Sequence, residues 1–273
     1  MSKISSNKVA IITGGSRGVG AATAKLLASK GWNVTITCTS SMDDANSVVK
    51  ECEKLGVEAI ALTADVSEDN SCIQTAQETI NKWGRIDALV NNAGTTKFVF
   101  NHADLDGLDA EDFLHIYKVN VVGPFQMVRA CKEMLLNSDN PSVVNISSIA
   151  GIKGLGSSLA YASSKGALNT MTKSMARNLG PIRVNAICPG FIQGDWLRNG
   201  MGDDLYNAAL ENLTNNTPLK LTVTPDTFST IHVQFSSSTA IPAGSLLRSD
   251  PNNSALCEGI PKPFALYYTE FAA

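Results

Sequence analysis

The chain has 273 residues, 44% of them hydrophobic, which is enough for one large α/β domain or two small ones with a sizeable core. Its formal net charge of −3 argues against a nucleic-acid or membrane-surface partner, because such proteins usually carry a basic face. The first residues contain only a short apolar run before a glycine pair, which fits neither a signal peptide nor a membrane span.

Apolar runs and segments with helical spacing alternate along the chain. Continuous apolar runs are typical of strands covered on both faces of a parallel sheet. The predicted strands are residues 8–13, 33–38, 58–63, 87–91, 142–147 and 183–188. The predicted helices are residues 21–29, 43–55, 71–83, a stretch within 110–129, and 159–179. This order predicts one α/β domain with a doubly wound parallel sheet and helices on both faces, and ligands bind such sheets at the carboxyl ends of the strands.

A glycine-rich turn follows the first predicted strand. In TGGSRGVG, residues 13–20, Gly14, Gly18 and Gly20 stand between a strand and a helix. Glycines there permit a tight turn and a close approach of a pyrophosphate, which the helix N-terminus stabilises. The spacing differs from G-x-G-x-x-G, and a packing role is the alternative. Its position after the first strand favours nucleotide binding.

The end of the second predicted strand indicates which nucleotide is bound. It lacks the acidic residue that would bind a ribose 2′-hydroxyl, and it carries Thr39 and Ser40 instead. Arg17 in the glycine turn offers a cation for a 2′-phosphate. We therefore expect NADP(H) rather than NAD, with a solvated loop charge as the alternative role of Arg17.

Polar residues also stand at other strand ends. Asp65 could accept a hydrogen bond from an adenine amino group or cap the next helix. Asn92, Ala93 and Gly94 are small enough to let a nucleotide lie against the backbone. Asn120 is predicted to lie inside a helix, where asparagine is unfavourable, so a hydrogen-bonding role is plausible.

One stretch has the composition of a proton-transfer site. Ser148 ends an apolar run, Tyr161 follows thirteen positions later, and Lys165 is four beyond the tyrosine. Residues four apart share a helix face, so a cation beside the phenol should favour the phenolate and lower the pKa of Tyr161. A phenol that exchanges its proton near neutral pH is a general acid or base. An exposed pair without chemistry is the alternative.

Taken in order, these motifs resemble the short-chain dehydrogenase/reductase family. The resemblance covers residues 7–219 and is nearest to NADPH-dependent carbonyl and 3-oxoacyl-carrier-protein reductases. It implies a single-domain Rossmann-type fold. The motifs are TGGSRGVG at 13–20, DV at 65–66, NNAG at 91–94, Asn120, NISS at 145–148, YASSK at 161–165 and CPG at 188–190.

The resemblance also implies the roles of four catalytic residues. Tyr161 would donate a proton to the carbonyl oxygen in reduction, or accept one in oxidation. Lys165 would lower the pKa of the tyrosine and hold the nicotinamide ribose, and Ser148 would donate a hydrogen bond to the developing oxyanion. Asn120 would hold a relay water. The implied cofactor-binding residues are Gly14, Ser16, Arg17, Gly18, Val19, Gly20, Thr39, Ser40, Asp65, Val66, Asn92, Ala93, Gly94, Tyr161, Lys165, Pro189, Gly190 and Ile192.

Residues 191–213 are expected to form an apolar lid over the substrate. The apolar side chains are Phe191, Trp196, Leu197, Met201, Leu205 and Tyr206, and ordinary core packing is the alternative. Phe98, Phe100 and His102 are candidates for the same pocket. A moderately apolar ketone, aldehyde or 3-oxoacyl thioester is the expected substrate.

The last part of the chain departs from the family. We expect a catalytic domain over residues 1–219 and a divergent segment over 220–273, rich in Ser, Thr, Pro and Asn and irregular in structure. No seventh-strand motif is visible, which predicts an open sheet edge. One hypothesis is that residues 227–273 are a replaced tail, translated from a shifted reading frame.

The sequence therefore predicts an NADPH-dependent oxidoreductase that reduces a carbonyl to an alcohol. The alternatives are a 3-oxoacyl-carrier-protein reductase of fatty-acid synthesis and a catalytically idle NADP-binding protein. We expect a small carbonyl or alcohol substrate, no nucleic-acid or membrane partner, a homodimer or homotetramer, and a cytoplasmic location. The scattered cysteines and isolated histidines predict buried or incidental thiols and no metal site.

Overall fold

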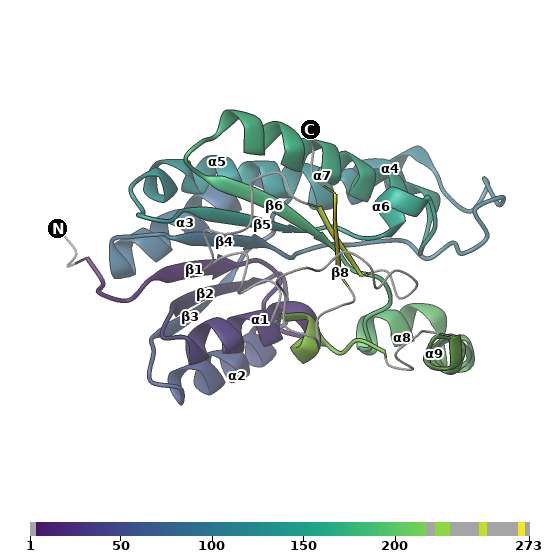
Figure 1. The fold of residues 1–273 in the computed structure, drawn as a ribbon, viewed down its shortest axis with the longest axis horizontal. Helices are drawn as coiled ribbons and strands as arrows, with labels where there is room; N and C mark the ends of the chain where they lie inside the picture. The colour runs from purple at the N-terminus through teal and green to yellow at the C-terminus, as the bar shows by residue number, and fades with distance from the viewer. Residues whose placement is uncertain (1–3, 217–221, 230–245, 250–266, 271–273) are drawn as a thin grey trace.

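The chain folds around one twisted sheet with helices on both faces (Figure 1). This computed structural model describes residues 4–216, 222–229, 246–249 and 267–270. The strand order is β3-β2-β1-β4-β5-β6-β7-β8, parallel as far as β7, with β8 antiparallel to it. The strands are β1 Val9–Ile12, β2 Asn33–Cys38, β3 Ala59–Thr63, β4 Ala88–Asn91, β5 Ser142–Ile146, β6 Arg183–Cys188, β7 Leu246–Ser249 and β8 Tyr267–Glu270.

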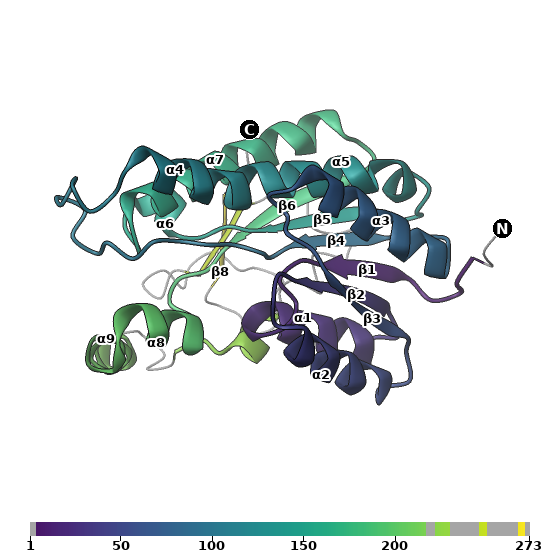
Figure 2. The ribbon, with the colours of Figure 1, turned by 180° about the vertical axis from the view of Figure 1, so that it is seen from behind.

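The helices divide between the two faces of the sheet. Figures 1 and 2 show α1 and α2 on one face and α3, α4, α5, α6 and α7 on the other. Each face has its own apolar cluster, because the buried strands present side chains to both sides. The helices are α1 Gly18–Ser29, α2 Met42–Glu53, α3 Asp69–Trp83, α4 Ala110–Tyr117, the π-helix η1 Lys118–Val122, α5 Gly123–Leu136, α6 Ala150–Lys153, α7 Leu159–Asn178, α8 Asp195–Met201 and α9 Asp203–Asn216.

The predicted fold class is confirmed, and the six predicted strands are present within two residues at each end. The stretch within 110–129 is more complex than one helix, because α4 passes through the π-turn η1 into α5. Pro124 has no N–H to donate to the carbonyl four residues earlier, so the normal helical register is interrupted there. The expected helix is thus divided close to Asn120.

The prediction of an open sheet edge after β6 is wrong. Strand β7 pairs in parallel with β6, and β8 pairs with β7. Pairing depends on backbone N–H and C=O groups rather than on a motif, so the free edge of β6 accepts a strand that carries no family signature. The rest of the expected irregular segment lies outside the described residues, and the division near residue 219 stays a prediction.

Residues 222–229 attach to the main body of the fold. Val223 forms a parallel bridge with Ile192, and its carbonyl accepts a hydrogen bond from the Gln193 N–H at 2.9 Å. Residues 225–229 form one helical turn, and the Phe228 side chain is fully buried in the cluster on the α1 face. This piece of the divergent segment is therefore part of the core.

Two further expectations concern thiols and membranes. The five cysteines within the described ranges are buried and form no disulfide, and Cys257 lies outside those ranges. Burial raises the pKa of the Cys131 thiol to about 12, which makes it unreactive at neutral pH. No helix in the part of the chain that the structure describes has the length and apolar character needed to cross a bilayer.

Candidate active site

The glycine turn forms a cradle of bare backbone between β1 and α1. A Cβ atom on Gly20 would lie only 2.3 Å from the Gly14 carbonyl oxygen, and Gly18 has a φ of 54°. Side chains would therefore fill or strain this turn. The turn opens onto the N-terminus of α1, whose backbone N–H groups favour an anion. These residues fit the pyrophosphate of a dinucleotide.

Asn92 fixes the NNAG turn against the cradle. Its Nδ2 donates to the carbonyl oxygens of Thr13 and Gly14, at 2.9 Å each. In return, the backbone N–H groups of Asn92 and Ala93 donate to the Thr13 hydroxyl, at 3.0 Å each. The Asn92 side chain is thus used to join two predicted cofactor loops.

The residues expected to select the nucleotide are exposed and belong to two adjacent segments, because the N–H groups of Gly14 and Gly15 donate to Thr37. Arg17 directly precedes α1, and Thr39 and Ser40 follow β2; all three are exposed. Ser16 and Val19, in the same turn, are half-buried. An exposed guanidinium and two exposed hydroxyl groups are suited to binding a phosphate.

Asp65 and Val66 lie in the loop between β3 and α3, and their side chains have different environments. Asp65 is exposed, and its carboxylate accepts a hydrogen bond from the Ser67 N–H at 2.9 Å. It does not cap α3, whose N-cap residue is Glu68. The Val66 side chain is buried in the apolar cluster under α3 and α5, so only its backbone could face a ligand.

Ser148, Tyr161 and Lys165 come together at the carboxyl end of β5. Ser148 follows β5, whereas Tyr161 and Lys165 lie one turn apart on α7, as their spacing predicts. A hydrogen-bonding interaction with the Ser148 hydroxyl acts to lower the pKa of the Tyr161 phenol. Lys165 Nζ lies 5.6 Å from the centre of the Tyr161 ring and donates to the Ile146 carbonyl at 2.7 Å.

The expected direction of the tyrosine pKa shift is wrong for this structure. Burial raises the pKa of Tyr161 to about 12, although the hydrogen bond from Ser148 acts to lower it. Burial also lowers the pKa of Lys165 to about 8. Burial thus disfavours the charged form of both groups, but at pH 7 the phenol keeps its proton and Lys165, below its pKa, stays mainly charged.

Asn120 occupies the π-turn and faces the same site. Its Nδ2 donates to the Thr95 carbonyl at 2.9 Å and to the Ser164 hydroxyl at 3.0 Å, and its Oδ1 accepts from the Thr95 N–H at 2.8 Å. π-turns often occur at functional sites. A Cβ atom on Gly94 would lie 3.4 Å from Asn120 Oδ1 and 3.7 Å from Lys165 Nζ, so this glycine lies directly beside both polar groups.

The loop after β6 faces the same end of the sheet. The Pro189 carbonyl accepts hydrogen bonds from the Ile149 N–H at 2.9 Å and from the Ser148 hydroxyl at 3.5 Å. Gly190 follows, and Ile192 is held by its bridge to Val223. This loop, which carries the expected cofactor-binding residues Pro189, Gly190 and Ile192, is thus tied to Ser148.

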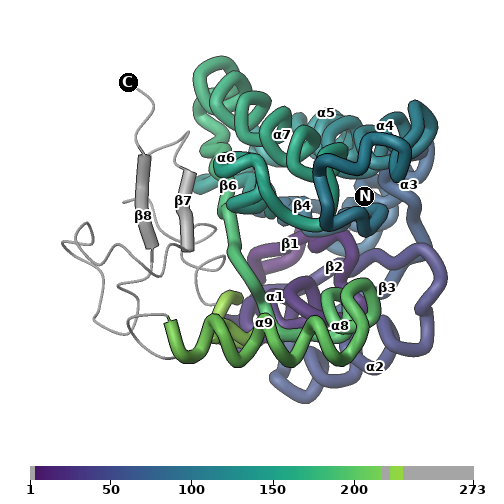
Figure 3. The backbone as a smooth tube through the Cα atoms, turned by 90° about the vertical axis from the view of Figure 1, so that its right-hand side faces the viewer, coloured from purple at the N-terminus to yellow at the C-terminus, as the bar shows by residue number. Residues whose placement is uncertain are grey.

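The expected lid consists of two helices, α8 and α9, at the carboxyl end of the sheet (Figure 3). Of its aromatic residues, one packs in the core and another is exposed beside the site, which are the two roles expected from the sequence. Tyr206 is buried against Phe191, with ring centres 5.4 Å apart, which is core packing. Trp196 is exposed, and its ring centre lies 6.2 Å from that of Tyr161.

The loop that follows NNAG places aromatic side chains beside Trp196. Phe98 and Phe100 join Trp196, whereas the His102 ring approaches the Gly156 carbonyl with its Nε2 at 3.3 Å. Several groups that hold the site residues were not predicted from the sequence, including Thr95, Ser164 and the Ile146 carbonyl. No spacing rule marks such partners, because they become neighbours only through the fold.

Comparisons with known proteins identify the family. The model of the short chain dehydrogenase family matches residues 8–202. The chain belongs to the short-chain dehydrogenase family. The resemblance inferred from the motifs is confirmed, and the chain is an oxidoreductase of a family that binds a nicotinamide dinucleotide.

Individual relatives show how far the likeness extends. A 3-oxoacyl-[acyl-carrier-protein] reductase, FabG, from Staphylococcus epidermidis is 34% identical over 216 residues, covering 78% of this chain and 85% of the relative. A crystal structure of a provisionally named short-chain dehydrogenase/reductase from Burkholderia xenovorans has 38% identity and a TM-score of 0.81, covering 89% of this chain and 96% of the other. An NAD⁺-bound xylitol dehydrogenase has 25% identity and a TM-score of 0.80, covering 88% and 96%.

Proposed function

We propose that this chain is an NADPH-dependent reductase that converts a ketone, aldehyde or 3-oxoacyl carbonyl into the alcohol. The observation that carries the proposal is the meeting of Ser148, Tyr161 and Lys165 beside a glycine cradle. When bound, the nicotinamide dinucleotide supplies the hydride. The protein must then supply a proton and stabilise the oxygen that becomes negatively charged.

Each of the three side chains has a defined task in this mechanism. Tyr161, protonated at neutral pH, donates its phenolic proton to the carbonyl oxygen as the alcohol forms. Ser148 donates a hydrogen bond to the same oxygen, which keeps the substrate beside the phenol. Lys165, below its pKa of about 8, places a positive charge beside the phenolate left behind.

Asn120 and the cofactor residues support this centre. Asn120 is proposed to anchor a relay water near Lys165, while Gly14, Gly18 and Gly20 hold the pyrophosphate. Asp65 would bind the adenine end of the cofactor, and Gly94, Pro189 and Gly190 would hold its nicotinamide end. A homodimer or homotetramer and a cytoplasmic location stay predictions.

Turnover is the direct test. Purified protein is supplied with NADPH and a panel of ketones, aldehydes and a 3-oxoacyl thioester, and NADPH consumption is followed by absorbance. Tyr161→Phe should bind NADPH as tightly as the wild type but lose nearly all turnover. Cofactor binding without turnover on any carbonyl or alcohol would support the idle-binder alternative, and substantial turnover by Tyr161→Phe would refute the proton-donor role.

NADPH is preferred over NADH because of the exposed side chains of Arg17, Thr39 and Ser40. The NAD⁺-bound xylitol dehydrogenase shows that a similar fold can take the other cofactor. Arg17→Ala should therefore weaken NADPH binding by about 10-fold or more, since a charge-assisted bond is lost, and leave NADH binding unchanged. Equal losses for both cofactors, or better use of NADH by the wild type, would reject this assignment.

The similarity to a 3-oxoacyl-carrier-protein reductase favours one alternative within the same chemistry. The substrate of such a reductase differs from a simple ketone only in the group attached to the carbonyl. Acetoacetyl-CoA in the substrate panel tests it, because a 3-oxoacyl reductase should use this thioester better than a simple ketone.

A further inference from the structure

A row of aromatic rings leads outward from Tyr161. The centre of the Trp196 ring lies 6.2 Å from that of Tyr161, Phe98 lies 5.6 Å beyond Trp196, and Phe100 lies 5.5 Å beyond Phe98. We call Trp196, Phe98 and Phe100 the aromatic wall. All three ring pairs are tilted by 45–55°, an arrangement in which aromatic pairs attract each other.

Helix α8 is shaped to hold this wall. Trp196 and Gly200 are four residues apart and therefore lie on one face of the helix. A Cβ atom on Gly200 would lie 2.0 Å from the tip of the Phe98 ring, so the ring occupies the space that a side chain would need. Phe98 is thus fixed between Trp196 and the backbone of α8, and its position depends on a glycine.

The wall is open to ligands rather than closed into the core. Trp196 is 45% exposed and Phe100 is 44% exposed, although large aromatic residues are usually buried. The other aromatic pair of the lid behaves differently, since Tyr206 is only 3% exposed. Exposed aromatic surface beside a reactive group is the kind of surface that binds an apolar ligand.

The charges next to the wall argue against a negatively charged ligand. Lys97, the neighbour of Phe98, is paired with Asp112 at 2.6 Å. Arg198, on α8, is paired with Asp203 at 2.9 Å. Both cations are therefore neutralised by carboxylates. A substrate that carries a phosphate group would therefore be attracted less strongly here than at a surface with unpaired basic residues.

We propose that the aromatic wall selects uncharged carbonyl compounds with a planar aromatic group a few bonds from the carbonyl. The ring of such a substrate contacts Trp196 and Phe98 while its carbonyl oxygen reaches Tyr161, since the Trp196 and Tyr161 rings are only 6.2 Å apart. This selectivity rests on the proposed reductase function and narrows its substrate class. Flexible 3-oxoacyl thioesters on a phosphorylated arm gain less from this surface.

The test uses a matched pair of ketones, 4-phenyl-2-butanone and 4-cyclohexyl-2-butanone. They carry the same methyl ketone and the same linker, so they differ only in the aromatic character of the ring. The wild type should show about 10-fold higher kcat/KM for the phenyl compound, a factor that one or two ring contacts supply. It should also use acetoacetyl-CoA less well than the phenyl ketone, and a preference for the thioester would overturn the proposal.

Three variants show whether the wall is responsible. Trp196→Leu should bring the phenyl-to-cyclohexyl ratio close to one, whereas Trp196→Phe should keep most of it. Phe125→Leu is the matched control, because Phe125 is also an exposed aromatic residue but lies on α5 under the Arg129 guanidinium. A ratio near one in the wild type, or a ratio that survives Trp196→Leu, would overturn the proposal.

A binding measurement separates this inference from the proposed function. Trp32 and Trp83 are 5% and 2% exposed, so a ligand at the wall should change mainly the fluorescence of Trp196. With NADP⁺ present, so that the ketone is not reduced, half-saturation should occur at about 10-fold lower concentration of the phenyl ketone than of the cyclohexyl ketone. Absence of turnover would refute the reductase function, and equal half-saturation would refute the wall.

Discussion

Two adjacent serines follow β5, and only Ser148 acts on the tyrosine phenol. Interaction with Ser148 acts to lower the pKa of Tyr161, whereas the Ser147 hydroxyl donates to the Lys165 carbonyl at 3.1 Å. Ser148→Ala should therefore reduce kcat by about 10²–10³, the usual cost of removing one donor to a developing oxyanion. Ser147→Ala is the matched control and should lose far less. Similar losses in both variants would mean that Ser148 acts only through packing.

The same residues show what a spacing pattern can predict. The four-residue interval correctly placed Tyr161 and Lys165 on one helix face, because helical geometry is local. The direction of the pKa shift was wrong, because it depends on how deeply the fold buries both groups. Lys165 is only 4% exposed, and its ammonium group is directed to the Ile146 carbonyl. Neither fact is contained in the interval between the two residues.

At the scale of elements, α8 is the part of the lid on which substrate choice should depend. Gly200→Ala adds a Cβ atom where the Phe98 ring now lies, so the ring must move away from Trp196. Alanine is the better helix former by about 1 kcal/mol, so the substitution does not weaken α8 itself. The phenyl-to-cyclohexyl ratio of kcat/KM should fall, as it does for Trp196→Leu.

The control for this prediction lies on the same helix. Asn199 is exposed, and Asn199→Ala adds helix propensity without touching Phe98. It should leave the ratio unchanged. An unchanged ratio in Gly200→Ala as well would mean that Phe98 is not part of the specificity surface.

The elements differ in how well the sequence predicts them. The six central strands were predictable because each is a short segment rich in apolar and β-branched residues between turn residues. The π-turn at residues 118–122 was not, since it results from Pro124 and from the contacts of Asn120. Strand β7 was missed for a different reason: its pairing depends on the free edge of β6, which lies far away in sequence.

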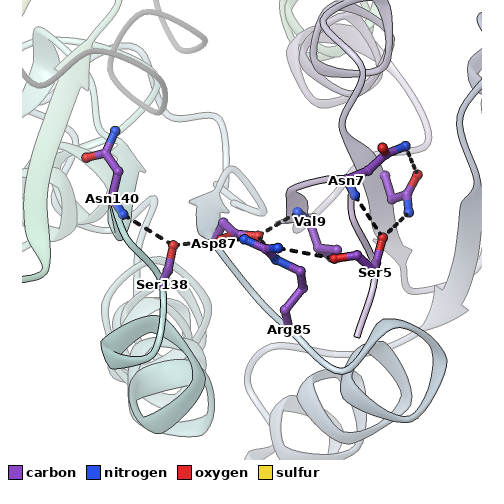
Figure 4. A network of polar contacts seen from close by, with 8 residues as sticks. Ser5, Asn7, Val9, Arg85, Asp87, Ser138 and Asn140 are labelled. Carbon is purple, nitrogen blue, oxygen red and sulfur yellow. Dashed lines mark hydrogen bonds and ion pairs between the residues drawn. The ribbon is translucent and has the colours of Figure 1, made fainter. Parts of the chain in front are cut away.

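At the scale of the whole molecule, a polar network lies at the end of the sheet opposite the active site (Figure 4). Asp87 is 1% exposed and accepts hydrogen bonds from Arg85 Nε and the Val9 N–H at 2.8 Å and from the Ser138 hydroxyl at 2.6 Å. The network joins the starts of β1 and β4 to the segment after α5. It therefore stabilises the frame that carries the site without touching the site.

Burial acts to raise the pKa of Asp87, but the hydrogen bonds from Arg85, Ser138 and the Val9 N–H outweigh it, so the pKa is lowered. A lowered folded-state pKa contributes stability above the unfolded-state pKa of about 3.9. That stability is lost as the pH falls through this value toward the folded-state pKa. The protein should therefore lose stability in acid partly through Asp87.

Asp87→Asn tests this contribution. At pH 7 the free energy of unfolding of the variant should be about 3–5 kcal/mol lower than that of the wild type, because Arg85 loses its partner in a largely buried ion pair. Urea unfolding measured at pH 7 and again near pH 3, at one protein concentration, should show the difference between wild type and variant shrinking in acid, because the wild-type carboxylate is then protonated in the unfolded state and folding must release that proton. Asp139→Asn, a change of an exposed carboxylate nearby, should cost no more than about 0.5 kcal/mol at either pH. A difference for Asp87→Asn that stays constant between the two pH values would show that the buried charge does not contribute to stability.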